Sequence, residues 1–148
     1  MNIYFTDGSA SPNPGPGGFA VIKDGQPWLV GGERMTTNIR MEGLALLTAL
    51  EDASGERCEI ITDSEFWVNV LTKWAPLWAT NGWQKKGGIK NLDIVQPLFE
   101  KYEKSRAKLI WTRGHVGTKL NELADEWANK ARQLHLRDVV KIDTIILS

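Results

Sequence analysis

The sequence predicts an α/β protein of three layers, in which helices flank a five-stranded mixed sheet. Two observations favour this fold class. Short runs of β-branched and aromatic residues alternate with longer segments in which apolar residues recur every three or four positions. The order of these segments is three strands, one helix, one strand, three helices, one strand and one helix, which is typical of a mixed sheet covered by helices.

The predicted strands are short runs of β-branched or aromatic residues. The first is expected to end at Asp7, because the segment 11–18 that soon follows holds too many glycines and prolines to continue a ladder. The pair Asp24-Gly25 predicts a hairpin turn between the second and third strands. The five strands are Ile3–Thr6, Phe19–Ile22, Trp28–Val30 with an extension over Glu33–Thr37, Cys58–Thr62 and Lys108–Thr112.

The predicted helices follow from apolar residues at three- and four-residue steps. Ser54-Gly55 ends the first long helix, and Ser64 is placed to cap the second. Four helices are about Asn38–Ala53, Ser64–Leu71, Leu92–Glu103 and Lys119–Leu134, and the tryptophan- and lysine-rich segment Trp74–Lys90 stands for the fifth in the predicted order.

We assign residues 1–136 to one domain and residues 137–148 to a C-terminal tail. The tail is expected to be strand-like, because Val139–Leu147 is rich in β-branched residues. Such a segment can add a strand to an exposed sheet edge, either within the chain or across a dimer. We expect a monomer, with dimerisation through the tail as the alternative.

The composition is that of an ordinary globular domain, with 42% hydrophobic and 24% charged residues. No apolar run approaches the roughly 20 residues of a membrane span, and the N-terminus lacks a signal-peptide pattern. The single cysteine, Cys58, excludes an intramolecular disulfide. We therefore expect a cytoplasmic protein without a membrane partner. Because 18 basic residues balance 18 acidic ones, binding to a polyanion has to come from local patches.

Four carboxylates are candidates for a functional site. Asp7 and Asp63 each follow a predicted strand, so one sheet can bring them to the same edge, although Asp-Gly is also an ordinary turn pair. Glu42 stands at the start of an apolar helical stripe, where a carboxylate needs a cation, although the helix dipole also favours an acid there. Asp125 has polar helical neighbours, so its pattern alone favours a surface position.

Gathered carboxylates repel one another unless hard divalent cations neutralise them. Oxygen ligands suit Mg²⁺ or Mn²⁺, whereas one cysteine and two histidines give no zinc cluster. Two such ions about 3.5–4 Å apart can clamp the attacking and leaving oxygens of an in-line phosphoryl displacement. The carboxylates therefore favour metal-dependent phosphoryl chemistry.

Several short motifs resemble, in order and spacing, those of bacterial type 1 ribonucleases H. The similarity covers about Met1 to Leu134, and the ordered set is more specific than any single motif. The resemblance implies a ribonuclease H-like fold and endonucleolytic hydrolysis of the RNA strand of RNA–DNA hybrids, leaving 5′-phosphate and 3′-hydroxyl ends. The motifs are Thr6-Asp7-Gly8-Ser9, Asn13-Pro14-Gly15-Pro16-Gly17-Gly18, Thr37-Asn38-Ile39-Arg40-Met41-Glu42, Thr62-Asp63-Ser64, Lys90-Asn91-Leu92-Asp93, Gly114-His115 and Asn121-Glu122-Leu123-Ala124-Asp125.

The resemblance also implies catalytic roles for single residues. Asp7, Glu42, Asp63 and Asp125 match the family's metal-binding carboxylates, which hold two Mg²⁺ ions with substrate and for which Mn²⁺ is a substitute. His115 matches a loop histidine that assists proton transfer or product release. Its neighbouring glycines give the loop freedom, and an unperturbed histidine titrates near neutrality, although a hydrogen-bonded loop histidine fits the pattern as well.

The substrate contacts implied by the resemblance fall into three groups. Gly8, Ser9, Asn13, Asn38 and Glu42 match residues that touch the RNA strand. Thr37 and Asn91 match a pocket for a phosphate of the DNA strand. Trp74, Trp78, Lys85 and Lys86 match a projecting basic handle that holds the DNA strand, although the two tryptophans are one helical turn apart and could simply pack the handle together.

Three departures from the family pattern predict weaker hybrid binding without loss of a metal ligand. Ile39 replaces a polar residue that contacts the minor groove, and Met35 stands where an arginine often completes the phosphate pocket. The handle also carries fewer basic residues. Two alternatives remain: a related enzyme with another substrate, such as a DNA nuclease, a recombinase or the ribonuclease domain of a reverse transcriptase, and a hybrid-binding module without activity.

Overall fold

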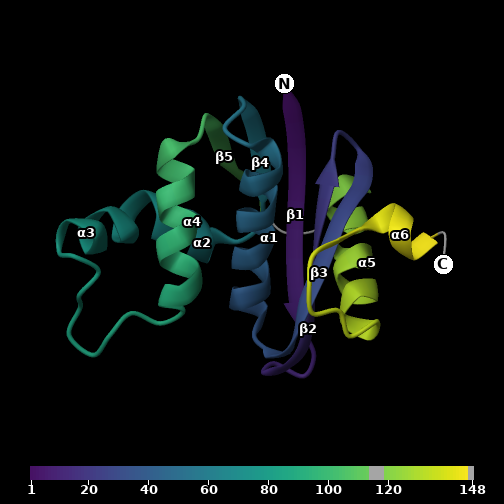
Figure 1. The fold of residues 1–148 in the computed structure, drawn as a ribbon, viewed down its shortest axis with the longest axis horizontal. Coiled ribbons are helices and arrows are strands. Elements are labelled where there is room, and N and C mark those ends of the chain that lie inside the picture. The colour runs from purple at the N-terminus through teal and green to yellow at the C-terminus, as the bar shows by residue number, and fades with distance from the viewer. Residues whose placement is uncertain (114–118, 147–148) are drawn as a thin grey trace.

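The computed structural model describes residues 1–113 and 119–146, and its centre is a mixed sheet of six strands (Figure 1). The strand order is β5-β4-β1-β2-β3-β6. β1, β4 and β5 run parallel, while β1, β2, β3 and β6 pair in antiparallel fashion. The strands are β1 (Asn2–Ala10), β2 (Gly15–Lys23), β3 (Gln26–Thr36), β4 (Cys58–Thr62), β5 (Ala107–Trp111) and β6 (Val140–Lys141).

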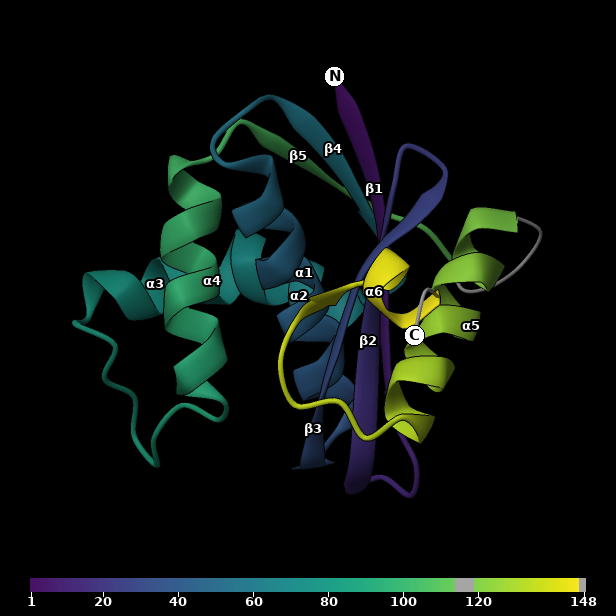
Figure 2. The same cartoon turned by 45° about the vertical axis from the view of Figure 1, so that its right-hand side comes forward.

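Helices cover both faces of this sheet, which confirms the predicted three-layer α/β fold. α1 and α4 lie on one side of β1, and α5 and α6 lie on the other (Figures 1 and 2). In the ranges that the structure describes, no helix is long and apolar enough to cross a membrane. The helices are α1 (Asn38–Ala53), α2 (Glu65–Asn69), a π-helical turn η1 (Val70–Trp74), α3 (Ala75–Thr80), α4 (Leu92–Lys104), α5 (Lys119–Gln133) and α6 (Ile142–Ile146).

β1 is longer than the sequence predicts. The strand does not end at Asp7 but continues to Ala10, because Ser9 and Ala10 pair with glycines of β2. β2 in turn begins at Gly15, so the glycine-rich segment is strand rather than loop, and only residues 11–14 connect the two strands. The prediction was wrong because it counted the low strand propensity of glycine and not the helices that pack against these strands.

The C-terminal tail adds a sixth strand to the sheet within the chain. Val140 pairs with Val30 of β3, and only two residues of the tail are strand, whereas a longer strand was predicted. Residues 137–139 are irregular, and the described residues after β6 form α6. Ile142 is 3% exposed and belongs to an apolar cluster with Val30, Ala128 and Ala131. The described part of the tail therefore packs against α5 and the edge strand β3.

Replacing Ile142 by Ala is expected to lower the free energy of unfolding by about 2–5 kcal/mol, because it leaves a cavity in this cluster. Val139 is half exposed, so Val139→Ala is a matched control that should change stability by less than about 0.5 kcal/mol. Urea unfolding measures both values. Equal midpoints for the two variants would contradict the role that the packing gives the tail.

Candidate active site

Asp7 and Asp63 lie at one edge of the sheet. The parallel ladder between β1 and β4 ends at the pair Phe5–Ile61. Asp7 comes two residues after Phe5, and Asp63 comes two residues after Ile61. Residues two apart in a strand face the same side of the sheet. The register of β1 and β4 therefore carries both carboxylates to the same place.

Two glycines let the neighbouring helices approach this edge. A β-carbon at Gly8 would overlap the backbone of α1 and come within 2.6 Å of the backbone nitrogen of Glu42. A β-carbon at Gly18 of β2 would likewise come within 2.5 Å of the carbonyl oxygen of Ala128 in α5. Because both positions lack a side chain, α1 brings Glu42 and α5 brings Asp125 toward the strand that carries Asp7.

Asp7 is a buried carboxylate whose pKa is strongly raised. It is buried, its Oδ1 accepts a hydrogen bond of 2.9 Å from the backbone N–H of Gly8, and its Oδ2 is buried without a partner among the described residues. Burial raises the pKa of Asp7 to about 8, and the negative charges of Asp63, Asp125 and Glu42 add to the rise. All four candidates therefore lie within electrostatic reach of one another.

These residues fit a hard divalent cation by their donor chemistry. Residues 1–113 and 119–146 contain no group of three or more acidic, histidine or cysteine side chains already placed to hold a metal ion. Asp7 nevertheless presents a buried oxygen to which no described residue donates, and burial and three further carboxylates raise its pKa. A cation at this oxygen would satisfy it and relieve the repulsion among the carboxylates.

His115 lies outside the described residues, so its role in proton transfer or product release stays a prediction.

The residues predicted to touch the RNA strand are joined by hydrogen bonds. Asn38 Oδ1 accepts from the backbone N–H of Ala10 at 2.7 Å, and Asn13 Oδ1 accepts from the N–H of Asn38 at 3.2 Å. Ser9 Oγ donates to Asn129 Oδ1 of α5 at 3.2 Å. These bonds hold the end of β1, the following loop, α1 and α5 together. Asn129 was not predicted, although it lies four residues after Asp125 on the same helix.

Thr37 and Asn91 are connected through Arg40. Thr37 caps α1 by accepting from the backbone N–H of Arg40 at 3.2 Å, and Asn91 Oδ1 accepts from Nη1 of the same arginine at 3.2 Å. Arg40 also forms salt bridges with Glu33 at 3.1 Å and Asp93 at 2.8 Å. Its guanidinium holds the pKa of Asp93 below the usual range. Arg40 was not predicted; a basic residue near a helix N-terminus, where the dipole disfavours it, is the signal that points to it.

The predicted handle is formed by α3 and the loop after it, which project from the molecule beyond α4 (Figure 1). Trp74 is half exposed, with its ring 6.0 Å from that of Phe66 and 6.4 Å from that of Trp78. Trp78 packs against the main core, and Lys85 Nζ lies 5.5 Å from the centre of its ring. Trp78 thus serves the packing of the handle, whereas Trp74 presents much of its surface.

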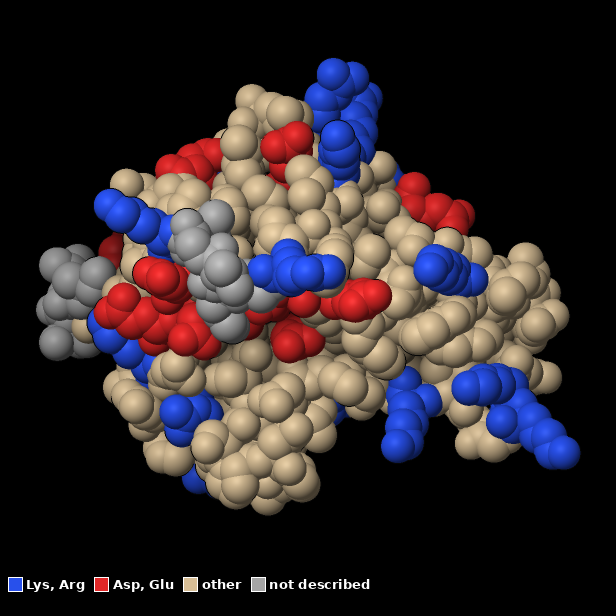
Figure 3. Space-filling model, turned by 180° about the vertical axis from the view of Figure 1, so that it is seen from behind, with Lys and Arg blue, Asp and Glu red and all other residues tan. Residues whose placement is uncertain are grey.

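A hollow of about 810 Å³ lies beside these residues, and Trp74, Lys86 and Asn91 are among those that line it. The hollow therefore connects the handle with the start of α4. Figure 3 shows acidic side chains gathered across the middle of one face, with basic side chains around them and on the projecting segment. This distribution suits a polyanion that is held by the basic side chains around the acidic centre.

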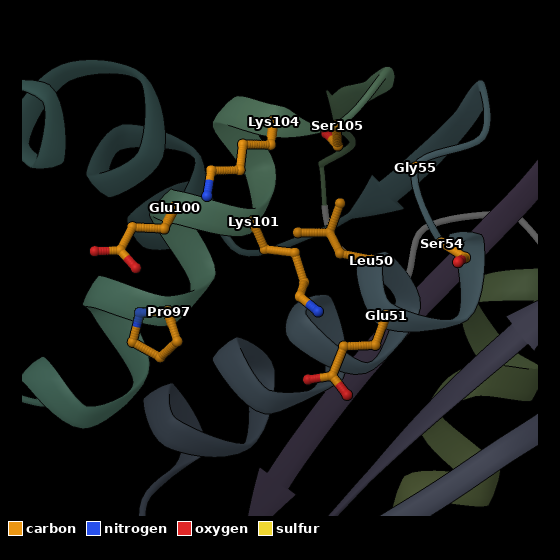
Figure 4. Close-up of a pocket in the computed structure, with 9 residues that line it drawn as sticks. All are labelled: Leu50, Glu51, Ser54, Gly55, Pro97, Glu100, Lys101, Lys104 and Ser105. Carbon is orange, nitrogen blue, oxygen red and sulfur yellow. The ribbon is translucent and has the colours of Figure 1, made fainter.

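A second hollow, of about 520 Å³, lies between the C-terminal parts of α1 and α4 (Figure 4). Lys101 extends from α4 toward α1, and Glu51 and Ser54 lie on the α1 side. This hollow is at the opposite end of α1 from Glu42, so it is separate from the candidate site.

A carboxylate edge with a lysine-bearing handle is the arrangement expected of a metal-dependent nuclease. A family model described as RNase H matches residues 1–133. The chain is 40% identical over 133 residues to a ribonuclease H of Pseudomonas putida, which covers 85% of this chain and 89% of the relative. It is 39% identical over 136 residues to a ribonuclease H of Vibrio cholerae, covering 87% of this chain and 86% of that one. The chain belongs to the ribonuclease H family and is a ribonuclease H enzyme.

Two solved structures support the fold. LC9-RNase H1, a type 1 RNase H with the type 2 active-site motif, aligns with a TM-score of 0.79 at 26% identity over 95% of this chain and 76% of that chain. A foamy viral protease-reverse transcriptase in complex with an RNA/DNA hybrid aligns with a TM-score of 0.78 at 18% identity, over 90% of this chain and 20% of that one. The resemblance to type 1 ribonucleases H is thus confirmed.

Proposed function

We propose that this enzyme hydrolyses the RNA strand of RNA–DNA hybrids at the acidic sheet edge, with the help of two divalent metal ions. The observation that carries the proposal is the buried Oδ2 of Asp7, which has no partner within residues 1–113 and 119–146. Burial and three further carboxylates raise the pKa of Asp7. Family membership supports the substrate class, and a structural neighbour is a complex with an RNA/DNA hybrid.

The residues of the edge would hold the metal. Asp7, Glu42, Asp63 and Asp125 supply the oxygen ligands that Mg²⁺ prefers and Mn²⁺ tolerates. When bound, such ions supply charge neutralisation and Lewis acidity at a phosphodiester, chemistry that here would yield 5′-phosphate and 3′-hydroxyl ends. The close packing at Gly8 fixes Glu42 relative to Asp7, so the ligands meet an incoming ion with little rearrangement of the backbone. We assign proton transfer or product release to His115.

Recognition of the hybrid would use both sides of the edge. RNA is distinguished from DNA by its 2′-hydroxyl groups, which an RNA duplex displays in a wide, shallow minor groove. On the side of β1 we assign contacts with the RNA strand to Gly8, Ser9, Asn13, Asn38 and Glu42. On the side of α3 and α4 we assign contacts with the DNA strand to Thr37, Asn91, Trp74, Trp78, Lys85 and Lys86.

The handle lysines are expected to act through charge. Replacing Lys85 and Lys86 together by Gln should weaken hybrid binding and lower the slope of log affinity against log salt by about one to two, since each phosphate contact contributes about 0.7–0.9. Fluorescence anisotropy at several salt concentrations measures the slope. The double variant Lys101→Gln, Lys104→Gln removes the same charge at the second hollow and should leave the slope unchanged. Equal slopes in the two double variants would contradict the assignment.

The proposed function is tested by cleavage of an end-labelled RNA–DNA hybrid beside matched RNA–RNA and DNA–DNA duplexes, with Mg²⁺, with Mn²⁺ and with chelator. The expected result is metal-dependent cutting confined to the RNA of the hybrid, with products that carry a 5′-phosphate. Cutting of the RNA–RNA or the DNA–DNA duplex at a rate comparable to that of the hybrid would contradict the proposed substrate. Absence of cutting with both metals would overturn the proposal.

A further inference from the structure

Helix α5 carries a polar row that begins at Asp125. Asn129 and Arg132 follow four and seven positions later, a spacing that puts the three on one helix face. At 1.5 Å per residue, Arg132 lies roughly 10 Å from Asp125 along the axis. α5 is also pressed against β2, because a β-carbon at Gly18 would overlap the backbone nitrogen of Arg132. Because Gly18 pairs with Ser9, the backbone of Arg132 lies close to the end of β1.

The guanidinium of Arg132 is poorly satisfied within the protein. Among the residues that the structure describes, its buried Nε has no hydrogen-bond partner, and its Nη2 makes a single long contact of 3.5 Å with Asn129 Oδ1. Over residues 1–113 and 119–146 its charge meets no carboxylate at salt-bridge distance. Arg40, in contrast, binds two carboxylates, and Lys130 of the same helix is paired with Glu126 at 3.2 Å. The buried Nε fixes where the guanidinium lies, and the terminal nitrogens, which are not buried in this way, leave its charge available to an anionic acceptor from outside the chain.

The surroundings of Arg132 connect it with the proposed RNA contacts. Asn129 Oδ1 accepts hydrogen bonds from both Ser9 Oγ and Arg132 Nη2. One amide oxygen therefore joins the arginine to β1, two residues after Asp7. The planar guanidinium suits phosphate better than any other side chain, because its donors match two phosphate oxygens at once.

We propose that Arg132, positioned by Asn129, binds a phosphate of the RNA strand at a distance from the cleavage point. The proposal rests on the proposed function and extends the RNA track from β1 onto α5. A duplex advances about 3.4 Å per nucleotide, so roughly 10 Å along α5 corresponds to about three nucleotides. Neither the composition nor the family motifs point to this residue, which lies beyond the last motif at Asp125.

The first experiment measures hybrid affinity against salt for Arg132→Met and for the matched control Lys130→Met, both in the full chain. Arg132→Met should lose about tenfold in affinity and lower the salt slope by about 0.7–0.9, the value for one phosphate contact. It should raise KM for cleavage and leave kcat close to that of the parent. Lys130→Met should change neither the slope nor KM, and Arg132→Lys should keep the slope but recover only part of the affinity.

The second experiment identifies the strand and position. Hybrids with a single uncharged methylphosphonate linkage at each site are bound to the parent and to Arg132→Met. At one position of the RNA strand, the methylphosphonate should weaken binding to the parent but not weaken binding to Arg132→Met further. The modified linkage and the substitution would then remove the same contact. Non-additivity only on the DNA strand, or a lower melting temperature of Arg132→Met with an unchanged salt slope, would overturn the proposal. A parent that neither binds nor cuts the hybrid would overturn the proposed function itself.

Discussion

Replacing Asp7 by Asn is expected to abolish cleavage and at the same time to stabilise the protein in the absence of metal. The carboxylate is buried among three others, so its pKa rises from the ordinary 3.8 to about 8. The folded state therefore retains a proton that the unfolded chain releases between about pH 4 and pH 8. The free energy of unfolding of the parent consequently falls as the pH rises through this window. Asn carries no charge, so the variant escapes this loss.

The expected gain for Asp7→Asn is about 1–3 kcal/mol at pH 8 and much less at pH 4, measured by urea unfolding with chelator. Cleavage of the hybrid should fall by about a thousandfold or more, because an ion that supplies several kcal/mol of transition-state stabilisation loses a ligand. The exposed Asp138→Asn is the matched control and should match the parent at both pH values. A variant less stable than the parent at pH 8, or one that cuts at the parental rate, would contradict the arrangement of carboxylates described above.

Replacing Gly8 by Ala is expected to lower the rate of cleavage by about 100-fold. The new methyl group would lie 2.6 Å from the backbone nitrogen of Glu42 and would overlap the backbone of Met41, neither of which can rotate away. α1 has to shift, and Glu42 shifts with it relative to Asp7. A displacement of about 1 Å at reacting groups can cost about 100-fold in rate, and overpacking costs about 1–3 kcal/mol in stability.

Single-turnover cleavage and urea unfolding of Gly8→Ala separate these two effects. Ile142→Ala is a useful control, because it destabilises the chain in a cluster that contains none of the four carboxylates and does not involve α1. It should keep a rate near that of the parent while folded. If the two variants lose activity equally, stability alone explains the effect, and the close approach of α1 at Gly8 has no part in shaping the site.

The fold could be predicted from the sequence wherever local pattern and tertiary packing agree. α1 begins at Asn38 and ends at Ala53 as predicted, because its apolar period, the Thr37 cap and the left-handed Ser54 act together. The end of β1 was mispredicted because glycines that disfavour an isolated strand are required beneath α1 and α5. In the tail, β-branched residues predicted a strand, whereas all but two of the described residues from Val140 onward form a short helix that buries Ile142. The domain boundary at residue 136 stays a prediction.

Only part of the candidate site could be predicted from local sequence patterns. Asp7 and Asp63 could be predicted because each follows a run of β-branched or aromatic residues, and the structure makes these two runs neighbouring parallel strands. The assignment of Asp125 to the site depended on the family resemblance, because its polar helical neighbours favour a surface position and do not indicate how α5 packs. Asn129 and Arg40 were not predicted, because these partners are far away in the chain: Ser9 and Asn129 are 120 positions apart, and Arg40 and Asn91 are 51 positions apart. No local period reports contacts of this range.

The most direct measurement is cleavage of the RNA–DNA hybrid as a function of Mg²⁺ concentration, for the parent and for the single variants Asp7→Asn, Glu42→Gln, Asp63→Asn and Asp125→Asn. We predict that the parent cuts only the RNA strand, that chelator stops it, and that each variant cuts far more slowly or needs much more Mg²⁺. Cleavage by the parent in chelator, or parental rates and parental Mg²⁺ dependence in all four variants, would contradict a metal site at this edge of the sheet.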